Sequence, residues 1–298
     1  MVEFKIYDES RLDDHIKLVL EVIEDWDWKP WYPNQEQLKS IYSREGFTPD
    51  TRHYVYDGEE LVGFLSSGVD GEVDGVLFGS FHIPFIKKGY EHIEDELFSK
   101  TINTLKERGV EAIRTTTMPG WGPMPKMLKK LGFGEQKLLA MRTIFETDAI
   151  DVSNFQKPEY IQVVDIIKDR EILKEAIHSA RGTSFEEINS NLDYYATHDM
   201  YYAGVVVNTD LVTSYGILYE GAKYEGDTIK RAFISRISFS KEVNKQILKE
   251  IFLYLVYKAK EMNIDLLWHQ PADNVSLDYY DELNLKFEPF YEYVLRLK

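Results

Sequence analysis

The amino-acid sequence predicts an α+β fold built twice, as two domains that each contain a mixed sheet flanked by helices. Three observations lead to this prediction. The 298 residues exceed what one hydrophobic core usually serves. Apolar residues make up 44% of the chain, with 20 Tyr and 16 Phe available for packing. The order of strands and helices in the first half returns in the second half at an offset of about 150 residues.

The first half begins with a strand, two helices and a hairpin. Residues 3–7 alternate in polarity and predict a short strand, whereas residues 12–26 carry apolar side chains at helical spacing. A second helix is expected over residues 34–42. Residues 54–56 and 61–65 flank a turn that contains Gly, which predicts a hairpin.

One long helix dominates the rest of the first half. A strand over residues 75–83 ends at Pro84 and leads into a helix over residues 90–108. Gly109 follows this helix directly and suits a left-handed C-terminal cap. The remaining elements are a strand over 110–116, a helix over 124–131 and a strand over 138–145.

The second half gives the same order of patterns. It comprises a strand over 160–167, helices over 169–180 and 185–196, strands over 201–207, 211–219 and 231–239, a helix over 241–262, a strand over 264–269, a helix over 275–283 and a strand over 290–297. The stretch between residues 147 and 158 is polar and ends in Pro, which is typical of a linker. We therefore predict domains over 1–147 and 158–298.

Composition and charge exclude several classes of function. The net charge of −16 disfavours nucleic acid as a partner, because such binding depends on Lys and Arg neutralising phosphates. The absence of Cys removes disulfides and thiolate chemistry, and the seven His residues show no metal-ligand spacing, so no metal site is expected. The amino terminus resembles no signal peptide and no apolar run could span a membrane, which predicts a cytoplasmic protein that does not bind membranes.

Two similar segments at equivalent places point to a known family. Residues 127–133 read Met-Leu-Lys-Lys-Leu-Gly-Phe, and residues 280–285 read Tyr-Asp-Glu-Leu-Asn-Leu after Asn274. Both resemble the Asn and Tyr-x-x-Leu-Gly-Phe marks of the GCN5-related N-acetyltransferase (GNAT) superfamily, and the order of elements resembles its tandem-domain type. The resemblance implies two tandem GNAT folds, the fold of acyl-CoA N-acyltransferases, and acetyl-CoA as cofactor.

The resemblance also implies where the cofactor binds. In GNAT proteins the strand before the long helix pairs with the pantetheine arm, and the following loop wraps the pyrophosphate. The equivalent segment here lies in the first half and gives these cofactor-binding candidates: His82, Ile83, Lys87, Lys88, Gly89, Tyr90, Glu91 and His92. Two adjacent Lys at a helix start would be relieved by an anion, although solvated lysines need none. The segment 237–247 of the second half contains no Gly and places Glu242 in the loop, so CoA is less expected there.

The catalytic candidates lie in different halves. The GNAT resemblance implies that a Tyr before Leu-Gly-Phe protonates the leaving thiolate, and this position holds Tyr280 in the second half but Leu128 in the first. His82 and Tyr90 are the alternative acids of the first half. Each has a plainer interpretation: Tyr280 as a core aromatic, His82 as a packed or surface residue, and Tyr90 as a cap over the helix start.

Other polar and aromatic residues suggest an acceptor site. Glu72 and Asp74 are candidate bases for the amine, although they suit an ordinary acidic turn equally well. Residues 25–33 contain four aromatic side chains beside Asp25, and residues 119–123 form a stiff Pro-Gly-Trp-Gly-Pro stretch. Both segments could border an acceptor cleft, and both could equally pack loops onto the core.

Three functions follow from these observations. The first is an acetyl-CoA-dependent N-acetyltransferase that acts on a primary amine of a small molecule or peptide. The second is a catalytically degenerate tandem GNAT that serves as a CoA-binding or interaction module. The third is another acyl or aminoacyl transferase, of the mycothiol synthase or peptidyl-bridge type. The sequence does not identify the acceptor or the oligomeric state.

Overall fold

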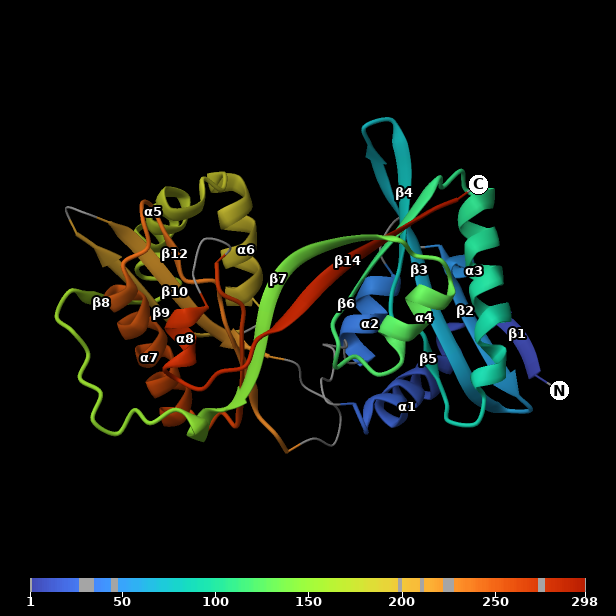
Figure 1. The fold of residues 1–298 in the computed structure, drawn as a ribbon, viewed down its shortest axis with the longest axis horizontal. Helices are drawn as coiled ribbons and strands as arrows, with labels where there is room; N and C mark the ends of the chain where they lie inside the picture. Colours follow the sequence, from blue (N-terminus) through green and yellow to red (C-terminus); the bar gives the residue numbers. More distant parts are fainter. Residues whose placement is uncertain are drawn as a thin grey trace. The chain divides into compact units, whose positions relative to one another are not determined.

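A computed structural model gives the fold of the chain (Figure 1). It describes residues 2–26, 35–43, 48–197, 200–209, 212–221, 228–272 and 277–297. The chain divides into two compact units. Unit 1 comprises Met1–Leu139 with Pro289–Lys298, and unit 2 comprises Ala140–Glu288.

Unit 1 contains the elements expected from the first half of the sequence. They are β1 (Val2–Ile6), α1 (Leu12–Ile23), α2 (Gln35–Tyr42), β2 (Arg52–Asp57), β3 (Glu60–Val73), β4 (Val76–Phe81), β5 (Phe85–Ile86), α3 (Glu94–Glu107), β6 (Ala112–Thr117) and α4 (Met124–Lys130). A short 3₁₀ turn at Glu91–Ile93 precedes α3. The sheet has the order β1-β2-β3-β4-β6, with β5 beside β3, and β4 and β6 are parallel.

Helices cover both faces of the unit 1 sheet. Adjacent residues of β2 point to opposite faces. Tyr54 donates or accepts a hydrogen bond with His15 of α1 at 3.0 Å, whereas His53 lies 3.3 Å from Thr104 of α3. Helices α1 and α3 therefore lie on opposite faces of the sheet (Figure 1). Buried apolar residues lie between the sheet and these helices.

Unit 2 repeats this order of elements. They are β8 (Ile161–Val164), α5 (Arg170–Arg181), α6 (Phe185–Thr197), β9 (Tyr201–Asn208), β10 (Thr213–Glu220), β11 (Arg231–Ile234), β12 (Ser238–Phe239), α7 (Lys245–Glu261), β13 (Leu266–His269) and α8 (Asp278–Asp281). The sheet has the order β13-β11-β10-β9-β8, with β12 beside β10, and β11 and β13 are parallel. Helices α5 and α6 pack on one face and α7 on the other (Figure 1).

Equivalent helix ends confirm the internal repeat. Gly109 after α3 and Asn263 after α7 both adopt left-handed backbone, with φ of 81° and 54°. The next residue in each case, Val110 or Ile264, donates its N–H back to a carbonyl of the last helical turn. Only Gly and Asn adopt this conformation readily, which explains why the sequence places them there.

The last strand of each half of the sequence pairs in the unit formed mainly by the other half. Strand β7 (Glu135–Glu146) pairs through its last four residues with β13 of unit 2, antiparallel. Strand β14 (Glu288–Arg296) pairs with β6 of unit 1, antiparallel. The boundaries of the two units therefore differ from those of the predicted domains, 1–147 and 158–298, at these two strands. Local polarity predicts a strand, but it does not specify which sheet edge the strand joins.

Candidate functional site

In both units, two parallel neighbouring strands separate partway along the sheet. In unit 1 the ladder between β4 and β6 ends at Ser80 and Arg114, after which β5 continues along β3. In unit 2 the ladder between β11 and β13 ends at Ile234 and His269, and β12 continues along β10. Each unit therefore has an opening in its sheet at the carboxyl ends of the parallel pair.

An extra residue in one strand produces the separation. Ile234 lies opposite Leu218, whereas Ser238 lies opposite Tyr215, so β10 advances three residues while the β11–β12 segment advances four. The segment from β4 to β5 shows the same extra residue against β3. Such a bulge bends the strand away from its neighbour. The predicted continuous strand over 231–239 is therefore interrupted at this point.

The bulge leaves backbone groups of unit 2 facing the opening. Ser240 donates its N–H to the Thr213 carbonyl at 2.9 Å. This hydrogen bond shows which residues of β12 turn their backbone N–H and C=O groups toward β10. In an antiparallel ladder, alternate residues turn their N–H and C=O groups to opposite sides. Phe239 and Ile237, which are both buried, therefore direct their N–H and C=O groups away from β10.

Unit 1 has one donor fewer in the same place. Lys87 donates its N–H to the Val62 carbonyl at 2.9 Å, so Ile86 and Pro84 hold the positions that face away from β3. Pro84 has no N–H. The opening of unit 1 is therefore less able to hold a polar chain than that of unit 2.

In unit 1 the chain supplies its own anion to the loop before α3. The Gly89 N–H donates to both carboxylate oxygens of Glu91, at 3.0 and 3.1 Å. This N–H group, followed by that of Glu91 itself, lowers the pKa of the Glu91 carboxyl. The first turn of α3 adds three further acids, Glu94, Asp95 and Glu96. This negative charge disfavours a phosphate at the helix start.

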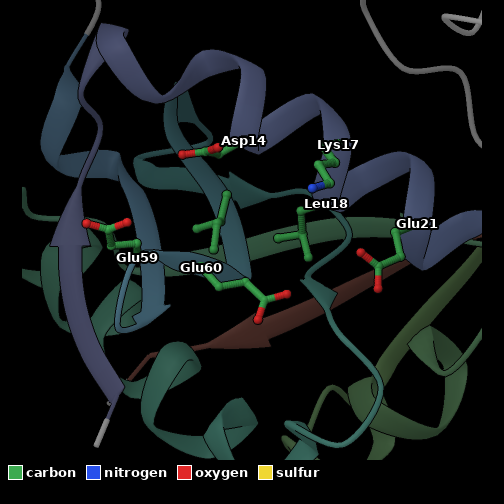
Figure 2. A pocket seen from close by; sticks show the side chains of 7 residues that line it. Asp14, Lys17, Leu18, Glu21, Glu59 and Glu60 are labelled. Atoms are coloured by element: carbon green, nitrogen blue, oxygen red, sulfur yellow. The ribbon is translucent and has the colours of Figure 1, made fainter.

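Lys87 forms ion pairs with two acidic residues of unit 1. Its Nζ lies 2.8 Å from Glu21 and 2.6 Å from Glu60, and hydrogen bonds to Glu21 and then Glu60 raise its pKa. Figure 2 shows these two carboxylates at a hollow of about 320 Å³ between α1 and the start of β3. The other residues that line the hollow are Asp14, Lys17, Leu18, Glu59 and Leu61. Four acids around this space make it a poor site for a diphosphate.

The loop before α7 has different contacts, although it also contains one acid, Glu242, which is exposed. The side chain of Asn244 accepts hydrogen bonds from the N–H groups of Gln246 and Ile247, at 3.0 and 3.1 Å, and so caps the helix. The first turn of α7 contains no acid. Among the described residues, none accepts a hydrogen bond from the backbone N–H groups of residues 241–245. With Lys241 and Lys245 beside them, these groups fit the phosphates of a nucleotide cofactor.

A buried pair of polar side chains lies where β11 and β13 separate. Nε2 of His269, the last residue of β13, is 2.8 Å from the Tyr280 hydroxyl of α8. Nδ1 of His269 is 3.3 Å from the carbonyl of Ile234, the last residue of β11. His269 is 1% exposed and Tyr280 is 0% exposed, and the rings of Phe252 and Phe287 pack against Tyr280.

The surroundings fix the protonation of this pair. A carbonyl oxygen only accepts hydrogen bonds, so Nδ1 of His269 carries the proton and Nε2 accepts from the Tyr280 hydroxyl. Desolvation lowers the pKa of His269 to about 4, although the Ile234 carbonyl partly offsets it. The imidazole is therefore neutral at pH 7 and holds the Tyr280 proton in a defined direction.

Unit 1 has no such pair at the equivalent positions. Thr115 takes the place of His269, and its hydroxyl donates to the Phe81 carbonyl at 2.8 Å. Leu128 takes the place of Tyr280 and is 0% exposed. The same scaffold therefore carries a proton donor in unit 2 and an apolar side chain in unit 1.

Solved structures share this architecture, although sequence comparison finds no relative. No family model matches the chain, and no curated protein matches its sequence. A tandem GNAT protein from the clavulanic acid biosynthesis pathway is 14% identical with a TM-score of 0.72, covering 99% of this chain and 98% of its own. A GCN5-related N-acetyltransferase from Sphaerobacter thermophilus is 10% identical with a TM-score of 0.63, covering 99% and 95%. The chain has the tandem GNAT fold.

A third similar structure carries a longer acyl donor. Saccharomyces cerevisiae N-myristoyltransferase, solved with bound myristoyl-CoA, is 12% identical with a TM-score of 0.54, covering 100% of this chain and 80% of its own. At these identities the comparison establishes the fold. The predicted α+β fold class and the predicted tandem GNAT architecture are confirmed.

In unit 1, the predicted cofactor-binding residues lie at the bulge between β4 and β5 and in the loop before α3. His82 donates its backbone N–H to Ser66 at 2.9 Å, and its side chain reaches the surface. Desolvation by surrounding protein, and then the charge of Arg52, lowers the pKa of His82. Because the His82 ring is exposed to solvent, its lowered pKa results from the protein atoms packed around it. It does not indicate an enclosed site. Ile83 is buried, and Lys88 and His92 are exposed.

Tyr90 is held by an acid outside the loop. Its hydroxyl donates to Asp57 at 3.0 Å, and this hydrogen bond is the largest cause that raises the pKa of Tyr90. The ring centroid lies 6.0 Å from that of His92. The contacts fix Tyr90 over the start of the helix, and they do not join it to His82 in one cluster.

The acceptor candidates named from the first half serve packing where they are described. Trp26 stacks on Phe85 with ring centroids 6.2 Å apart, and Trp121 packs on Phe290 at 5.7 Å. Glu72 and Asp74 are exposed beside the turn between β3 and β4. Residues 27–33 and Asn274 lie outside the described residues.

His269 is the site residue that sequence reasoning missed. It ends the predicted strand 264–269, and nothing in its local pattern links it to Tyr280, 11 residues later. The signal available was its position at the end of the strand that follows the long helix. Among the described residues, no cluster of His, Asp and Glu could hold a metal ion, and no helix is long and apolar enough to cross a membrane.

Proposed function

We propose that the chain is an acetyl-CoA-dependent N-acetyltransferase whose reaction takes place in unit 2. One observation carries the proposal. The buried Tyr280–His269 pair lies at the point where β11 and β13 separate, next to a loop with open N–H groups. These observations support a proton donor and a phosphate-binding loop in the same unit.

Residues of β12 and the following loop would hold acetyl-CoA. The N–H and C=O groups of Phe239 and Ile237 face the opening and would pair with the amides of its pantetheine arm. The N–H groups of residues 241–245, with Lys241 and Lys245, would bind its diphosphate. When bound, acetyl-CoA supplies an acetyl group activated as a thioester.

Tyr280 would provide the proton for the leaving thiolate. Its O–H would turn from Nε2 of His269 to the thiolate sulfur, so that the O–H bond breaks as the S–H bond forms, and the proton lost by the attacking amine would restore the phenol. The aromatic packing around the pair excludes water, and the His269 imidazole orients the hydroxyl through a 2.8 Å hydrogen bond. A neutral His269 accepts a hydrogen bond from the phenol without taking up its proton. In this scheme Tyr280 is the catalytic acid and His269 is its positioning residue.

Unit 1 would serve as a structural partner in this scheme. Glu91 already satisfies the Gly89 N–H, and Leu128 replaces the acid. This supports one active and one degenerate GNAT unit, with the active unit at the carboxyl-terminal side of the sequence. The opposite assignment, with acetyl-CoA at Lys87 and Lys88, remains the prediction of the sequence alone.

Binding and transfer test the proposal together. Isothermal titration calorimetry with acetyl-CoA should give one site per chain, and a thiol-release assay with a panel of polyamines, amino acids and peptides should detect transfer. Absence of acetyl-CoA binding in the calorimeter would exclude the proposal. Binding with no transfer to any amine would support the alternative of a CoA-binding module.

A further inference from the structure

A buried hydroxyl lies beside the Tyr280–His269 pair. Thr143 of β7 is directly opposite His269 of β13 in the antiparallel ladder. It is 1% exposed, and its Oγ1 makes no hydrogen bond with any residue that the structure describes. A buried hydroxyl without a partner lowers stability, because it has lost its hydrogen bonds to water. Valine has the same shape and would pack here without this cost, so packing alone does not explain the threonine.

The Thr143 side chain lies on the same face of the sheet as the imidazole of His269. Adjacent residues of a strand alternate between faces, so Thr143 shares a face with Phe145. The rings of Phe145 and His269 both contact Phe252 of α7, with centroids 6.0 and 5.1 Å from it. Directly opposite residues of an antiparallel ladder have Cβ atoms about 4.5–5.5 Å apart. The Thr143 hydroxyl is therefore next to the imidazole.

The orientation of the imidazole places the Tyr280 oxygen on the side of β7. Nδ1 of His269 faces the carbonyl of Ile234 in β11, which is the neighbour of β13 on one side. In an imidazole ring the edge opposite Nδ1 is the Cδ2–Nε2 bond. This edge is therefore turned toward β7, the neighbour of β13 on the other side. The Tyr280 hydroxyl, 2.8 Å from Nε2, thus lies on the side of the ring where Thr143 lies.

The proposed acid step creates a charge that His269 does not stabilise. When the Tyr280 O–H gives its proton to the thiolate sulfur, the phenol oxygen becomes negative. Nδ1 of His269 carries the ring proton, so Nε2 presents a lone pair to this oxygen. The lone pair repels the phenolate, and burial of both side chains raises the cost of the charge. A further hydrogen-bond donor beside the Tyr280 oxygen would offset this cost.

Unit 1 has a different side chain at the position of Thr143. The counterpart of His269 in unit 1 is Thr115, and the residue opposite Thr115 in the ladder is Tyr293 of β14. Tyr293 is half-buried and much larger than threonine. The scaffold therefore does not require threonine here, and the small buried hydroxyl occurs in the unit that carries Tyr280.

We propose that the Thr143 hydroxyl donates a hydrogen bond to the Tyr280 oxygen as the phenolate forms, so that Thr143 is a second positioning residue of the reaction. This inference rests on the proposed function. Thr143 keeps its own proton: the Tyr280 O–H bond breaks, the S–H bond forms, and the amine proton restores the phenol. In the resting protein Tyr280 donates to His269, and the Thr143 hydroxyl has no partner among the described residues. The new contact therefore stabilises the transition state more than the bound substrate.

Removal of the hydroxyl without a change of shape tests the proposal. Thr143→Val should lower kcat by roughly 10- to 100-fold, because a hydrogen bond to a charged oxygen is lost. The KM for acetyl-CoA, and its affinity in the calorimeter, should stay within about twofold, since the contact forms only in the transition state. Thr143→Ser keeps a hydroxyl and should retain most of kcat. Thr143→Ala replaces the Val variant if that chain does not fold. An unchanged kcat without the hydroxyl would overturn the proposal.

Thr147 provides the matched control. It is 2% exposed, and its Oγ1 also makes no hydrogen bond with the part of the chain that is described. Its N–H donates to Asp265, which precedes β13, whereas His269 ends that strand. Thr147→Val should keep kcat within about twofold of the wild type. Both Val variants should unfold at the same urea concentration as the wild type or a higher one, since each removes an unsatisfied hydroxyl. A lower midpoint for Thr143→Val alone would reveal a structural role and contradict the proposal.

A double-mutant cycle separates this inference from the proposed function. If Thr143 acts through the Tyr280 oxygen, Thr143→Val should change kcat by no more than about twofold in the Tyr280→Phe chain. Losses of kcat that multiply in the double variant would refute the inference. A wild type that transfers no acetyl group to any amine would refute the proposed function, and this inference with it. With an active wild type and an impaired Tyr280→Phe chain, full activity of Thr143→Val would refute only the role of Thr143.

Discussion

Units 1 and 2 share a fold but differ in the side chains beside the separated strands and at the start of the following helix. Both sheets contain the same bulge and the same separated parallel strands. Three pairs of equivalent residues carry the difference: Pro84 and Ile237, Glu91 and Asn244, and Leu128 and Tyr280. The backbone opening is thus a property of the scaffold, whereas a few side chains decide whether it can bind a cofactor.

The contrast between Glu91 and Asn244 shows how one side chain changes a loop. Glu91 turns its carboxylate back onto Gly89, so a fixed negative charge occupies the loop amides. Asn244 turns its neutral side chain forward onto the helix, so the loop amides stay open. A site for an anion therefore depends on where the nearest acceptor points as much as on the loop that surrounds it.

The largest expected effect comes from the hydroxyl present only in unit 2. Tyr280→Phe should lower kcat by roughly 10²- to 10⁴-fold, because it removes the proton donor while the ring still fills its space. The KM for acetyl-CoA should change little. Steady-state kinetics with the best acceptor measures both constants.

A buried tyrosine of unit 1 provides the control. Tyr54 also bonds to a buried histidine, His15, at 3.0 Å, but it lies in the core away from the opening. Tyr54→Phe should keep kcat within about twofold of the wild type, because it removes the same hydroxyl far from the reaction. Similar losses of kcat in both variants would break the proposed distinction between the units.

Charge reversal in the two loops should locate the cofactor. Lys241→Glu/Lys245→Glu should weaken acetyl-CoA binding by roughly 10- to 100-fold at low salt, since two attractive charges become repulsive. Lys87→Glu/Lys88→Glu should leave the affinity within about twofold, because Lys87 is already paired with Glu21 and Glu60. Calorimetry measures both. The reverse outcome would return the cofactor site to unit 1.

Acidification should destabilise both units, most strongly through His15 in unit 1 and His269 in unit 2. Desolvation lowers the pKa of His15 to about 3 and that of His269 to about 4, from an ordinary 6.5. The unfolded chain therefore binds more protons than the folded chain below pH 6.5, and stability falls as the pH drops. Each histidine should cost about 2 kcal/mol between pH 6.5 and 4.5.

Urea unfolding at several pH values measures this loss of stability. His15→Gln should reduce the pH dependence contributed by unit 1, where His53 and His82 also have lowered pKa values. His269→Gln should reduce that contributed by unit 2, because glutamine does not titrate. The two variants thus serve as controls for each other. An unfolding free energy that stays constant across this pH range in the wild type would contradict the assigned burial of both imidazoles.

The smallest expected effects concern the equivalent helix ends. Gly109→Ala and Asn263→Ala should each lower the free energy of unfolding by about 1 kcal/mol, since alanine is strained in left-handed backbone. Asn263→Gly should stay within about 0.5 kcal/mol of the wild type, because glycine adopts this conformation freely. Thermal unfolding measures all three. A neutral Gly109→Ala would show that the two helix ends are not equivalent.

The tandem fold could be predicted from the sequence, because periodicity and turn residues act over short distances. The long helices after residues 90 and 241 were predicted, although both begin a few residues later, at Glu94 and Lys245. The predicted acid, Tyr280, lies where the resemblance places it in the fold, and its catalytic role stays a prediction.

The sheet that each strand joins, and the contacts that form the candidate site, depend on long-range packing and could not be predicted from the sequence. Strands β7 and β14 have ordinary strand patterns, and their exchange depends on long-range pairing that no local signal encodes. The contact of His269 with Tyr280 likewise joins a strand to a helix across the core. The Glu91 carboxylate occupies the Gly89 N–H in the loop before α3. The direction of such a side chain depends on its neighbours in the folded structure.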